Sequence, residues 1–186
     1  MHCGAQIKKM GYLEIDNTWT LFLDRDGVIN EKRENDYVKN WNEFSFLNGA
    51  LQAISTLSNI FGRIIIVTNQ RGVGKGVMKE GDLVIIHNKM SQEIKLNFGK
   101  IDAIYYCTEL SDDSDCRKPN IGMGEKALID FPEIELTKSI IVGDSCSDMI
   151  FGERLNMKKV LIGNGEYKFD SDWQFESLYA FSLMIL

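Results

Sequence analysis

Short apolar runs alternate with longer stretches of helical spacing along most of the chain. Five runs have the length and β-branched character of buried strands, and they lie near residues 19–24, 63–68, 101–107, 138–143 and 158–162. Helices are expected between them, at residues 49–60, 79–98, 124–130 and 147–156. Strands that alternate with helices are typical of a parallel sheet covered on both faces. The pattern therefore predicts a three-layer α/β sandwich with a mostly parallel five-stranded sheet.

Three features outside this pattern bear on the organisation of the chain. Residues 30–45 are polar and too long for a routine connection, which favours a functional loop over a site. The aromatic tail, residues 173–186, is expected to complete the core rather than to form a dimer contact. Spacings of 44 residues from Asp24 to Thr68 and 26 from Lys118 to Asp144 leave no room for a large cap domain. We expect a single domain over residues 1–186, with its core at about 19–163.

Composition narrows the function classes. The 186 residues carry a formal charge of −6, which argues against a nucleic-acid partner or an anionic membrane surface. No stretch approaches the ~20 apolar residues that span a bilayer, and no leader segment is recognisable, so a cytoplasmic protein is expected. The four cysteines are scattered, which favours reduced thiols over a disulfide framework.

Acidic and hydroxyl side chains end three of the apolar runs. Asp24 and Asp26 follow the first run, Thr68 ends the second, and Asp144 follows the fourth. In an open parallel sheet, groups at the carboxyl ends of neighbouring strands converge on one crevice. Clustered carboxylates suit Mg²⁺ better than zinc, and Asp148 adds a further one. The spacing therefore predicts a magnesium site that addresses a phosphate.

Amide and basic groups accompany this cluster. Thr68 and Asn69 lead into a loop with three glycines, residues 70–76. This loop begins with Gln70, and its backbone amides are expected to approach a phosphate. Arg117 and Lys118 supply positive charge between the third strand and the helix at 124–130. The sequence thus places cations and amides beside the carboxylates.

Absent residue types restrict the chemistry. The only histidines are His2, at the terminus, and His87, within an expected helix where it is structural or at the surface. No histidine follows Ser145 to serve as the base of a serine esterase. No cysteine precedes an arginine at the spacing of a cysteine-phosphatase loop. A carboxylate is therefore expected to be the nucleophile, with a second carboxylate as acid and base.

The ordered motifs resemble the haloacid dehalogenase superfamily of phosphatases over about residues 19–163. A closer resemblance, to the branch of heptose bisphosphate phosphatases and histidinol-phosphate phosphatases, is carried by the segments DRDGVIN, TNQRGVGKG, IDAIYYC and CRKPNIGM. This resemblance implies a Rossmann-like fold and a Mg²⁺-dependent phosphomonoesterase.

The resemblance also implies a role for each motif residue. Asp24 would be the nucleophile that forms an aspartyl-phosphate, and Asp26 the general acid and base. Thr68 and Lys118 would hold the transferring phosphoryl group. The metal ligands would be Asp24, Asp144 and the main-chain carbonyl of Asp26. Substrate contacts are implied for four further residues: Asn69, Gln70, Arg71 and Arg117.

This chain departs from the branch at two places. Its members often carry a structural zinc held by Cys-x-His and Cys-x-Cys, whereas this chain has CTE at 107–109 and SDC at 114–116. Two of the four ligands are absent, so structural zinc is not expected. Ser145 stands where heptose-bisphosphate members often have lysine.

Two classes of function follow. The favoured hypothesis is a phosphatase for a small sugar phosphate, a D-glycero-D-manno-heptose 1,7-bisphosphate 7-phosphatase, with histidinol phosphate as the alternative substrate. A non-catalytic phospho-acceptor module uses similar residues, but its acceptor aspartate lies on a middle strand rather than the first. Catalytic phosphate release distinguishes the two classes. The oligomeric state is left open.

Overall fold

The computed structural model describes residues 14–165 and 170–185. Within them, six strands form one parallel sheet in the order β3-β2-β1-β4-β5-β6. The strands are β1 Thr20–Leu23, β2 Arg63–Asn69, β3 Ala103–Cys107, β4 Ser139–Gly143, β5 Lys158–Ile162 and β6 Trp173–Phe175.

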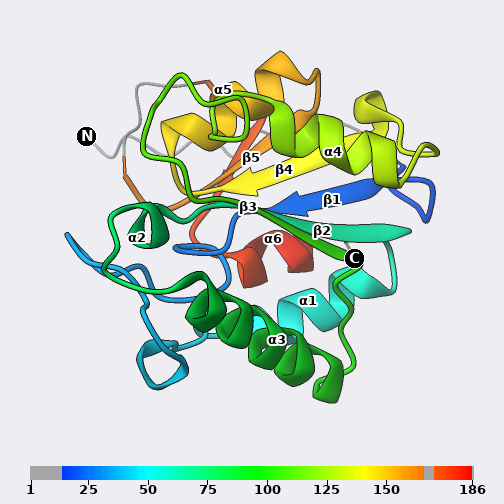
Figure 1. The fold of residues 1–186 in the computed structure, drawn as a ribbon. Helices are drawn as coiled ribbons and strands as arrows, with labels where there is room; N and C mark the ends of the chain where they lie inside the picture. Colours follow the sequence, from blue (N-terminus) through cyan, green and yellow to red (C-terminus); the bar gives the residue numbers. More distant parts are fainter. Residues whose placement is uncertain (1–13, 166–169, 186) are drawn as a thin grey trace, which may run out of the picture.

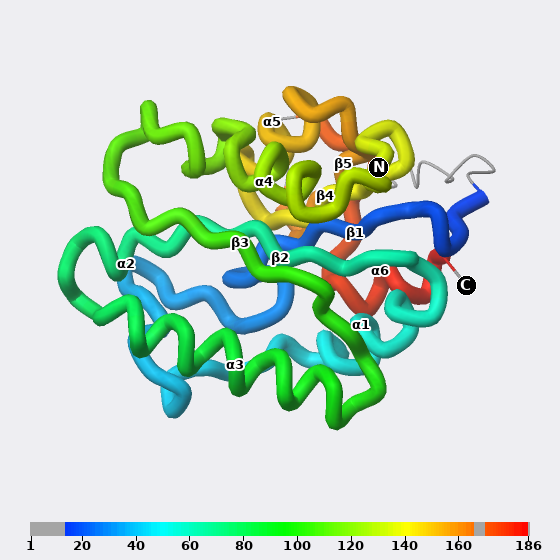
Figure 2. Tube along the Cα trace, turned by 45° about the vertical axis from the view of Figure 1, so that its right-hand side comes forward, coloured from blue at the N-terminus to red at the C-terminus, as the bar shows by residue number. Residues whose placement is uncertain are grey.

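Helices cover both faces of the sheet (Figure 1). Two lie on one face, α4 Gly122–Asp130 and α5 Cys146–Arg154. Three lie on the other, α1 Ala50–Ser58, α3 Glu80–Leu96 and α6 Leu178–Ile185. Figure 2 shows the same two layers after rotation. Two short 3₁₀ helices, Trp41–Glu43 and Leu136–Lys138, and the one-turn helix α2 Arg71–Gly74 complete the described elements.

Successive side chains of each strand pack into two separate cores, one on each face of the sheet. Leu21 and Leu23 of β1 pack in the cluster that contains Ile54 of α1, whereas Phe22 packs in the cluster that contains Phe151 of α5. Successive side chains of a strand point to opposite faces, so a strand buried on both sides must be apolar throughout. This requirement explains why the strands read as continuous apolar runs in the sequence.

The strand order places the end of β1 at the centre of the sheet. Leu23 pairs in register with Ile66 of β2 on one side and with Val142 of β4 on the other. The chain fills β2 and β3 on one side of β1 and then crosses to β4, which makes this a topological switch point. Ligands of open α/β sheets bind in the crevice outside the strand ends at such points.

All five expected strands are confirmed, but the predicted five-stranded sheet was one strand short. The sixth strand, β6, pairs with β5, and α6 then packs beside α1. Trp173, Leu178 and Phe181 are buried in the core cluster of that face. The described part of the tail therefore completes the core, as expected. No large cap is present in the described residues, which is also as expected.

The segment with three glycines was interpreted wrongly. Instead of an open loop, residues 71–74 form the one-turn helix α2. A Cβ on Gly72 would lie 3.0 Å from the Tyr37 ring, so glycine at this position lets residues 30–45 pack against α2. Lys75 lies over the same ring, 5.3 Å from its centroid, rather than in the cavity described below.

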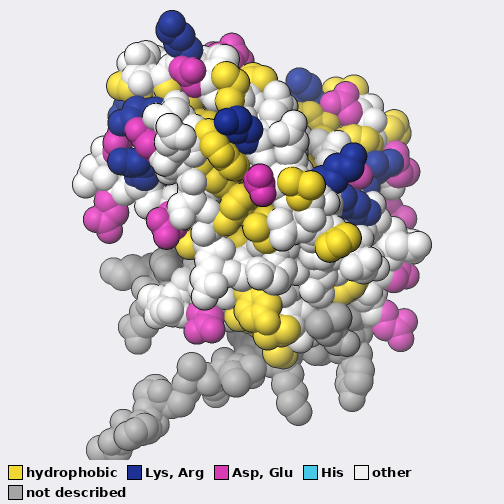
Figure 3. Space-filling model, turned by 90° about the horizontal axis from the view of Figure 1, so that it is seen from below, with side chains coloured by type: hydrophobic (Ala, Val, Ile, Leu, Met, Phe, Trp, Pro, Cys, Tyr) yellow, Lys and Arg dark blue, Asp and Glu magenta, His cyan; other side chains and the backbone are white. Residues whose placement is uncertain are grey.

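Figure 3 shows the face of the lower helical layer, where hydrophobic side chains lie among charged ones. On α3, Leu83, Ile86 and Met90 are buried, whereas Val84 and Ile85 are partly exposed. Only one side of this helix therefore contributes to the core. In the described residues, no helix is both long and apolar enough to cross a bilayer.

The expectation of reduced cysteines was wrong for two of them. Cys107, the last residue of β3, and Cys116 form a disulfide, with their Cα atoms 5.5 Å apart. Cys146 is free and exposed, and Cys3 lies outside the described residues. Spacing alone did not reveal the pair, because the loop after β3 must first fold back to bring Cys116 to the strand end.

Reduction of this disulfide should lower the free energy of unfolding by about 2–3 kcal/mol, because the crosslink constrains a short loop in the unfolded chain. Thermal unfolding with and without dithiothreitol measures the effect. A variant with both Cys107→Ser and Cys116→Ser is the control, since its stability should not respond to the reductant. The same response in both proteins would contradict the prediction.

Candidate active site

A cavity of about 280 Å³ opens at the carboxyl ends of the central strands. Loops after β1, β2 and β4, together with residues 30–45 and the segment before α4, supply its walls. The residues to which the resemblance assigned catalytic, metal or substrate roles all line this cavity: Asp24, Asp26, Thr68, Asn69, Gln70, Arg71, Arg117, Lys118 and Asp144. The sheet therefore brings residues from four separate segments to one place.

Asp24 directly follows β1 and lies at the floor of the cavity. Its side chain is almost buried, and Oδ1 accepts hydrogen bonds from the Arg25 main chain at 2.8 Å and from Lys118 Nζ at 3.1 Å. Gly27 has a φ of 86°, and a Cβ there would lie 2.2 Å from Asp144 Oδ2. Glycine is required at this position because the loops after β1 and β4 approach so closely.

The second aspartate of the β1 loop is held by a ring of donors. Both oxygens of Asp26 accept from Arg25 at 2.8 Å, while Asn30 donates at 2.9 Å and Gln70 at 2.8 Å. Burial acts to raise the pKa of Asp26, but the charge and hydrogen bonds of Arg25 outweigh it and hold the pKa below its usual range. In this arrangement Asp26 is held as a carboxylate.

Arg25 itself is fully buried beneath the cavity. Its guanidinium group lies 3.2 Å from His87 Nε2 of α3. Burial lowers the pKa of His87 to about 3, and the charge of Arg25 adds to this shift. His87 is therefore neutral at physiological pH. Of the two expectations for His87, the structural one is confirmed and the surface one is wrong.

The residues at the end of β2 contact other site residues. Asn69 accepts from the Lys118 main-chain N–H and donates to the Lys118 carbonyl, each at 3.0 Å. Gln70 is buried and donates to Thr68 Oγ1 at 2.9 Å as well as to Asp26. The side-chain amide groups of both residues thus tie the β2 loop to groups on neighbouring loops.

Lys118 contacts residues of three other segments: the β1 end, β2 and α5. Its ammonium group lies 2.5 Å from Asp148 Oδ1 and donates to the Val67 carbonyl at 2.7 Å, besides its contact with Asp24. Burial alone would lower the pKa of Lys118, but the carboxylates of Asp148 and Asp24 more than offset it and raise the pKa. The cavity therefore contains a buried, fully protonated lysine beside the Asp24 carboxyl.

An all-oxygen cluster lies beside this lysine. Oxygens of Asp24, Asp144 and Asp148 lie within 4.8 Å of one another. Asp144 Oδ1 is buried and has no hydrogen-bond partner among the described residues, while Oδ2 accepts from Lys32 at 2.7 Å. Buried carboxylate oxygens without a donor suit a hard divalent cation. Asp24 and Asp144 therefore fit Mg²⁺, whereas both oxygens of Asp148 accept from Lys118 or Ser145.

The electrostatics of Asp24 agree with a cation site. Burial raises the pKa of Asp24 to about 7, Lys118 opposes this shift, and the Asp148 carboxylate adds to it. Burial also raises the pKa of Asp144, and Lys32 opposes that shift. A divalent cation favours the ionised form of each ligand that it binds. The cluster is therefore short of positive charge, which a bound cation would provide.

Residues 30–45 contribute side chains that the sequence did not single out. The expectation that this segment lies over the site is confirmed, because it supplies part of the cavity wall: Lys32, Arg33, Asp36, Tyr37 and Val38. Burial alone would lower the pKa of Lys32, but its hydrogen bond to Asp144 raises it above the usual value. The polarity of the segment indicated a functional loop, yet no spacing rule identified which residue would reach Asp144.

Comparisons with known proteins agree with this geometry. The family model described as polynucleotide kinase 3 phosphatase matches residues 20–176. The D-glycero-alpha-D-manno-heptose-1,7-bisphosphate 7-phosphatase of Mycobacterium tuberculosis is 36% identical over 173 residues, which are 90% of this chain and 91% of that protein. The D-glycero-beta-D-manno-heptose-1,7-bisphosphate 7-phosphatase of Vibrio cholerae is 33% identical over 155 residues, or 78% and 82% of the two chains.

A solved structure resembles the whole described fold. The D,D-heptose 1,7-bisphosphate phosphatase from B. bronchiseptica, complexed with magnesium and phosphate, superimposes with a TM-score of 0.81 at 29% identity. The match covers 90% of this chain and 97% of that one. That relative therefore binds magnesium and phosphate on a fold that this chain shares.

Proposed function

We propose, since this chain belongs to the polynucleotide kinase 3 phosphatase family, that it hydrolyses the 7-phosphate of a D-glycero-D-manno-heptose 1,7-bisphosphate with the help of Mg²⁺. The observation that carries the proposal is the Asp24 carboxyl at one end of the cavity, because it contacts the buried Lys118 and also belongs to the carboxylate cluster. We further propose that the chain is a single-domain cytoplasmic enzyme and that it acts on a small sugar phosphate. The charge of −6 supports the absence of a nucleic-acid partner.

Phosphoryl transfer proceeds in two displacements. An Asp24 oxygen attacks phosphorus, the ester P–O bond breaks, and Asp26 gives its proton to the departing sugar oxygen. Water then attacks the phosphorus of the aspartyl-phosphate, Asp26 takes the proton of that water, and the Asp24 carboxylate leaves. Asp26 must loosen its bonds to Arg25 to carry a proton in the first step, whereas the second step uses the carboxylate as the structure has it.

Charge stabilisation comes from groups around the phosphoryl oxygens. Lys118 and the Thr68 hydroxyl lie at the cavity floor beside Asp24 and would hold these oxygens. Asp24, Asp144 and the main-chain carbonyl of Asp26 would hold Mg²⁺. When bound, the metal would neutralise negative charge on the phosphoryl group and on its own ligands. Asn69 and Gln70 act in this proposal by fixing the positions of Lys118, Thr68 and Asp26.

The second phosphate distinguishes the heptose bisphosphate from histidinol phosphate. Arg71 and Arg117 line the cavity, and their guanidinium groups suit a second anionic group on the substrate. An aminoalkyl imidazole offers neither arginine an anionic partner. We therefore favour the bisphosphate and assign the distal phosphate to these two residues.

Steady-state kinetics on both substrates test the proposal. We expect kcat/KM for the bisphosphate to exceed that for histidinol phosphate at least about 10-fold, because hydrogen bonds to charged groups contribute about 1.5–3 kcal/mol. Both anomers of the bisphosphate are assayed, with Mg²⁺ present and a zinc-selective chelator included, since zinc is not expected to be needed. Equal efficiency, or a preference for histidinol phosphate, would show that the substrate assignment is wrong.

A further inference from the structure

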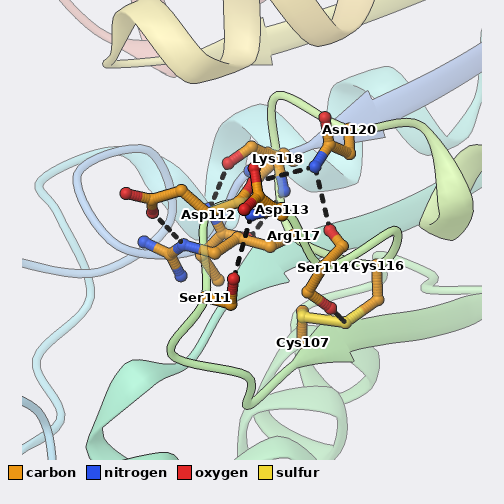
Figure 4. Close-up of a disulfide and its surroundings, with 10 residues drawn as sticks. Cys107, Ser111, Asp112, Asp113, Ser114, Cys116, Arg117, Lys118 and Asn120 are labelled. Atoms are coloured by element: carbon orange, nitrogen blue, oxygen red, sulfur yellow. Dashed lines mark hydrogen bonds and ion pairs between the residues drawn. A yellow bond between two sulfur atoms is a disulfide. The ribbon is translucent and has the colours of Figure 1, made fainter.

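Two arginines of the cavity share one carboxylate. Arg71 of α2 and Arg117 of the loop before α4 both contact Asp112 Oδ1, through Nη2 at 2.5 Å and through Nε at 3.1 Å. Figure 4 shows Asp112 against the guanidinium group of Arg117. The arginine side chains are 33% and 12% exposed, whereas the Asp112 side chain is 81% exposed. A carboxylate at the surface therefore neutralises one of two charges that face the cavity.

The loop that carries Asp112 is fastened at several points. Its ends are joined by the disulfide between Cys107 and Cys116, and the Arg71 guanidinium also donates to the Leu110 carbonyl at 2.9 Å. Asn120 donates to the Asp112 carbonyl at 2.9 Å (Figure 4). These bonds fix the backbone, so Asp112 is presented to the arginines by a constrained loop and its side chain alone can turn away.

The shared carboxylate leaves donors of the arginines unused. Arg71 Nε and Arg117 Nη1 are buried and have no hydrogen-bond partner among the described residues. Buried donors without an acceptor are unfavourable, and a guanidinium group has five N–H donors to satisfy. A phosphate has more acceptor oxygens and more negative charge than one carboxylate, and it pairs with arginine in the stronger bidentate geometry. The site is thus better matched to a phosphate than to Asp112.

We propose that Asp112 is a specificity-determining residue, a resident carboxylate that occupies the distal-phosphate position until the second phosphate of the substrate displaces it. This inference rests on the proposed function, because it concerns the distal group of the same substrate. The Asp112 side of both ion pairs is exposed, so water can solvate its carboxylate when the side chain turns away, which lowers the cost of displacement. The negative charge of Asp112 nevertheless remains beside the incoming phosphate and weakens the binding of bisphosphates but not of monophosphates.

The Asp112→Asn variant tests this role. Its KM for the heptose 1,7-bisphosphate should fall by about 3- to 10-fold, because the Asp112 carboxylate no longer competes with the distal phosphate for the two arginines. Its KM for the heptose 7-phosphate should stay the same. The matched control is Asp113→Asn, because Asp113 lies on the same loop and its main-chain N–H bonds to Ser111 (Figure 4). The control should change neither KM. An unchanged or higher KM for the bisphosphate in Asp112→Asn, or an equal change for both substrates, overturns the inference.

A second readout does not depend on the heptose substrate. Turnover of p-nitrophenyl phosphate is inhibited with fructose 1,6-bisphosphate or fructose 6-phosphate, and Asp112→Asn should lower the inhibition constant of the bisphosphate alone by a similar factor. If the wild type hydrolyses no heptose phosphate but this difference appears, the proposed substrate is wrong and the role of Asp112 stands. Identical inhibition constants in wild type and Asp112→Asn overturn the inference.

Discussion

Replacing Asp24 with asparagine should reduce phosphate release by at least about 10⁴-fold while the protein stays folded, since an amide cannot form the phosphorylated intermediate. The amide oxygen can still accept from the Arg25 main chain and from Lys118, so the local hydrogen bonds survive. Steady-state turnover of p-nitrophenyl phosphate and of the heptose bisphosphate measures the loss.

The stability of the same variant provides a second check. Asp24 is buried beside Asp144 and Asp148, and the variant removes one of three like charges. In the absence of metal, its unfolding temperature should therefore equal or exceed that of the wild type. Asp113→Asn, an exposed acid outside the cavity, is the matched control and should retain wild-type turnover. Turnover by Asp24→Asn within 10-fold, roughly, of the wild type would exclude Asp24 as the nucleophile.

The Asp26→Asn variant should lose about 10²- to 10⁴-fold in kcat with the heptose bisphosphate, the usual contribution of a general acid and base. Its effect should depend on the leaving group. Expulsion of p-nitrophenolate needs no proton, so phosphorylation of Asp24 remains fast, whereas hydrolysis of the aspartyl-phosphate lacks its base.

Rapid mixing of Asp26→Asn with p-nitrophenyl phosphate is therefore expected to give a burst of about one p-nitrophenolate per enzyme, followed by slow turnover. The wild type serves as the reference under the same conditions. Equal losses with both substrates and no burst would mean that Asp26 supports the fold of the site rather than proton transfer. Its four hydrogen bonds make that comparison necessary.

Elements that follow directly from local patterning could be predicted from the sequence. Strand β2 has seven residues, most of them β-branched, and it is buried on both faces. Its length and position could therefore be predicted from the sequence. Asp24 and Asp144 could be assigned to one crevice because parallel neighbours end at the same edge of the sheet. Strand β6 was not recognised because it has only three residues and a partly polar face.

Contacts between distant loops could not be predicted. Lys32 reaches Asp144 across 112 positions of sequence, and the two have no motif in common. Asp112 has the appearance of an ordinary surface acid in the sequence, and only the folded loop sets it between Arg71 and Arg117. The glycines at 72–76 suggested an open loop because local composition does not report that Tyr37 packs against Gly72.

The central claim is that phosphate passes through the Asp24 side chain, and chemical trapping tests it most directly. The wild type is quenched with borohydride during turnover of the heptose 1,7-bisphosphate, and its peptides are analysed by mass spectrometry. Borohydride reduces an acyl phosphate to an alcohol, so we predict homoserine at position 24 in the wild type and none in Asp24→Asn. Unmodified Asp24 in enzyme quenched while it releases phosphate, or modification of a different carboxylate, would contradict the account.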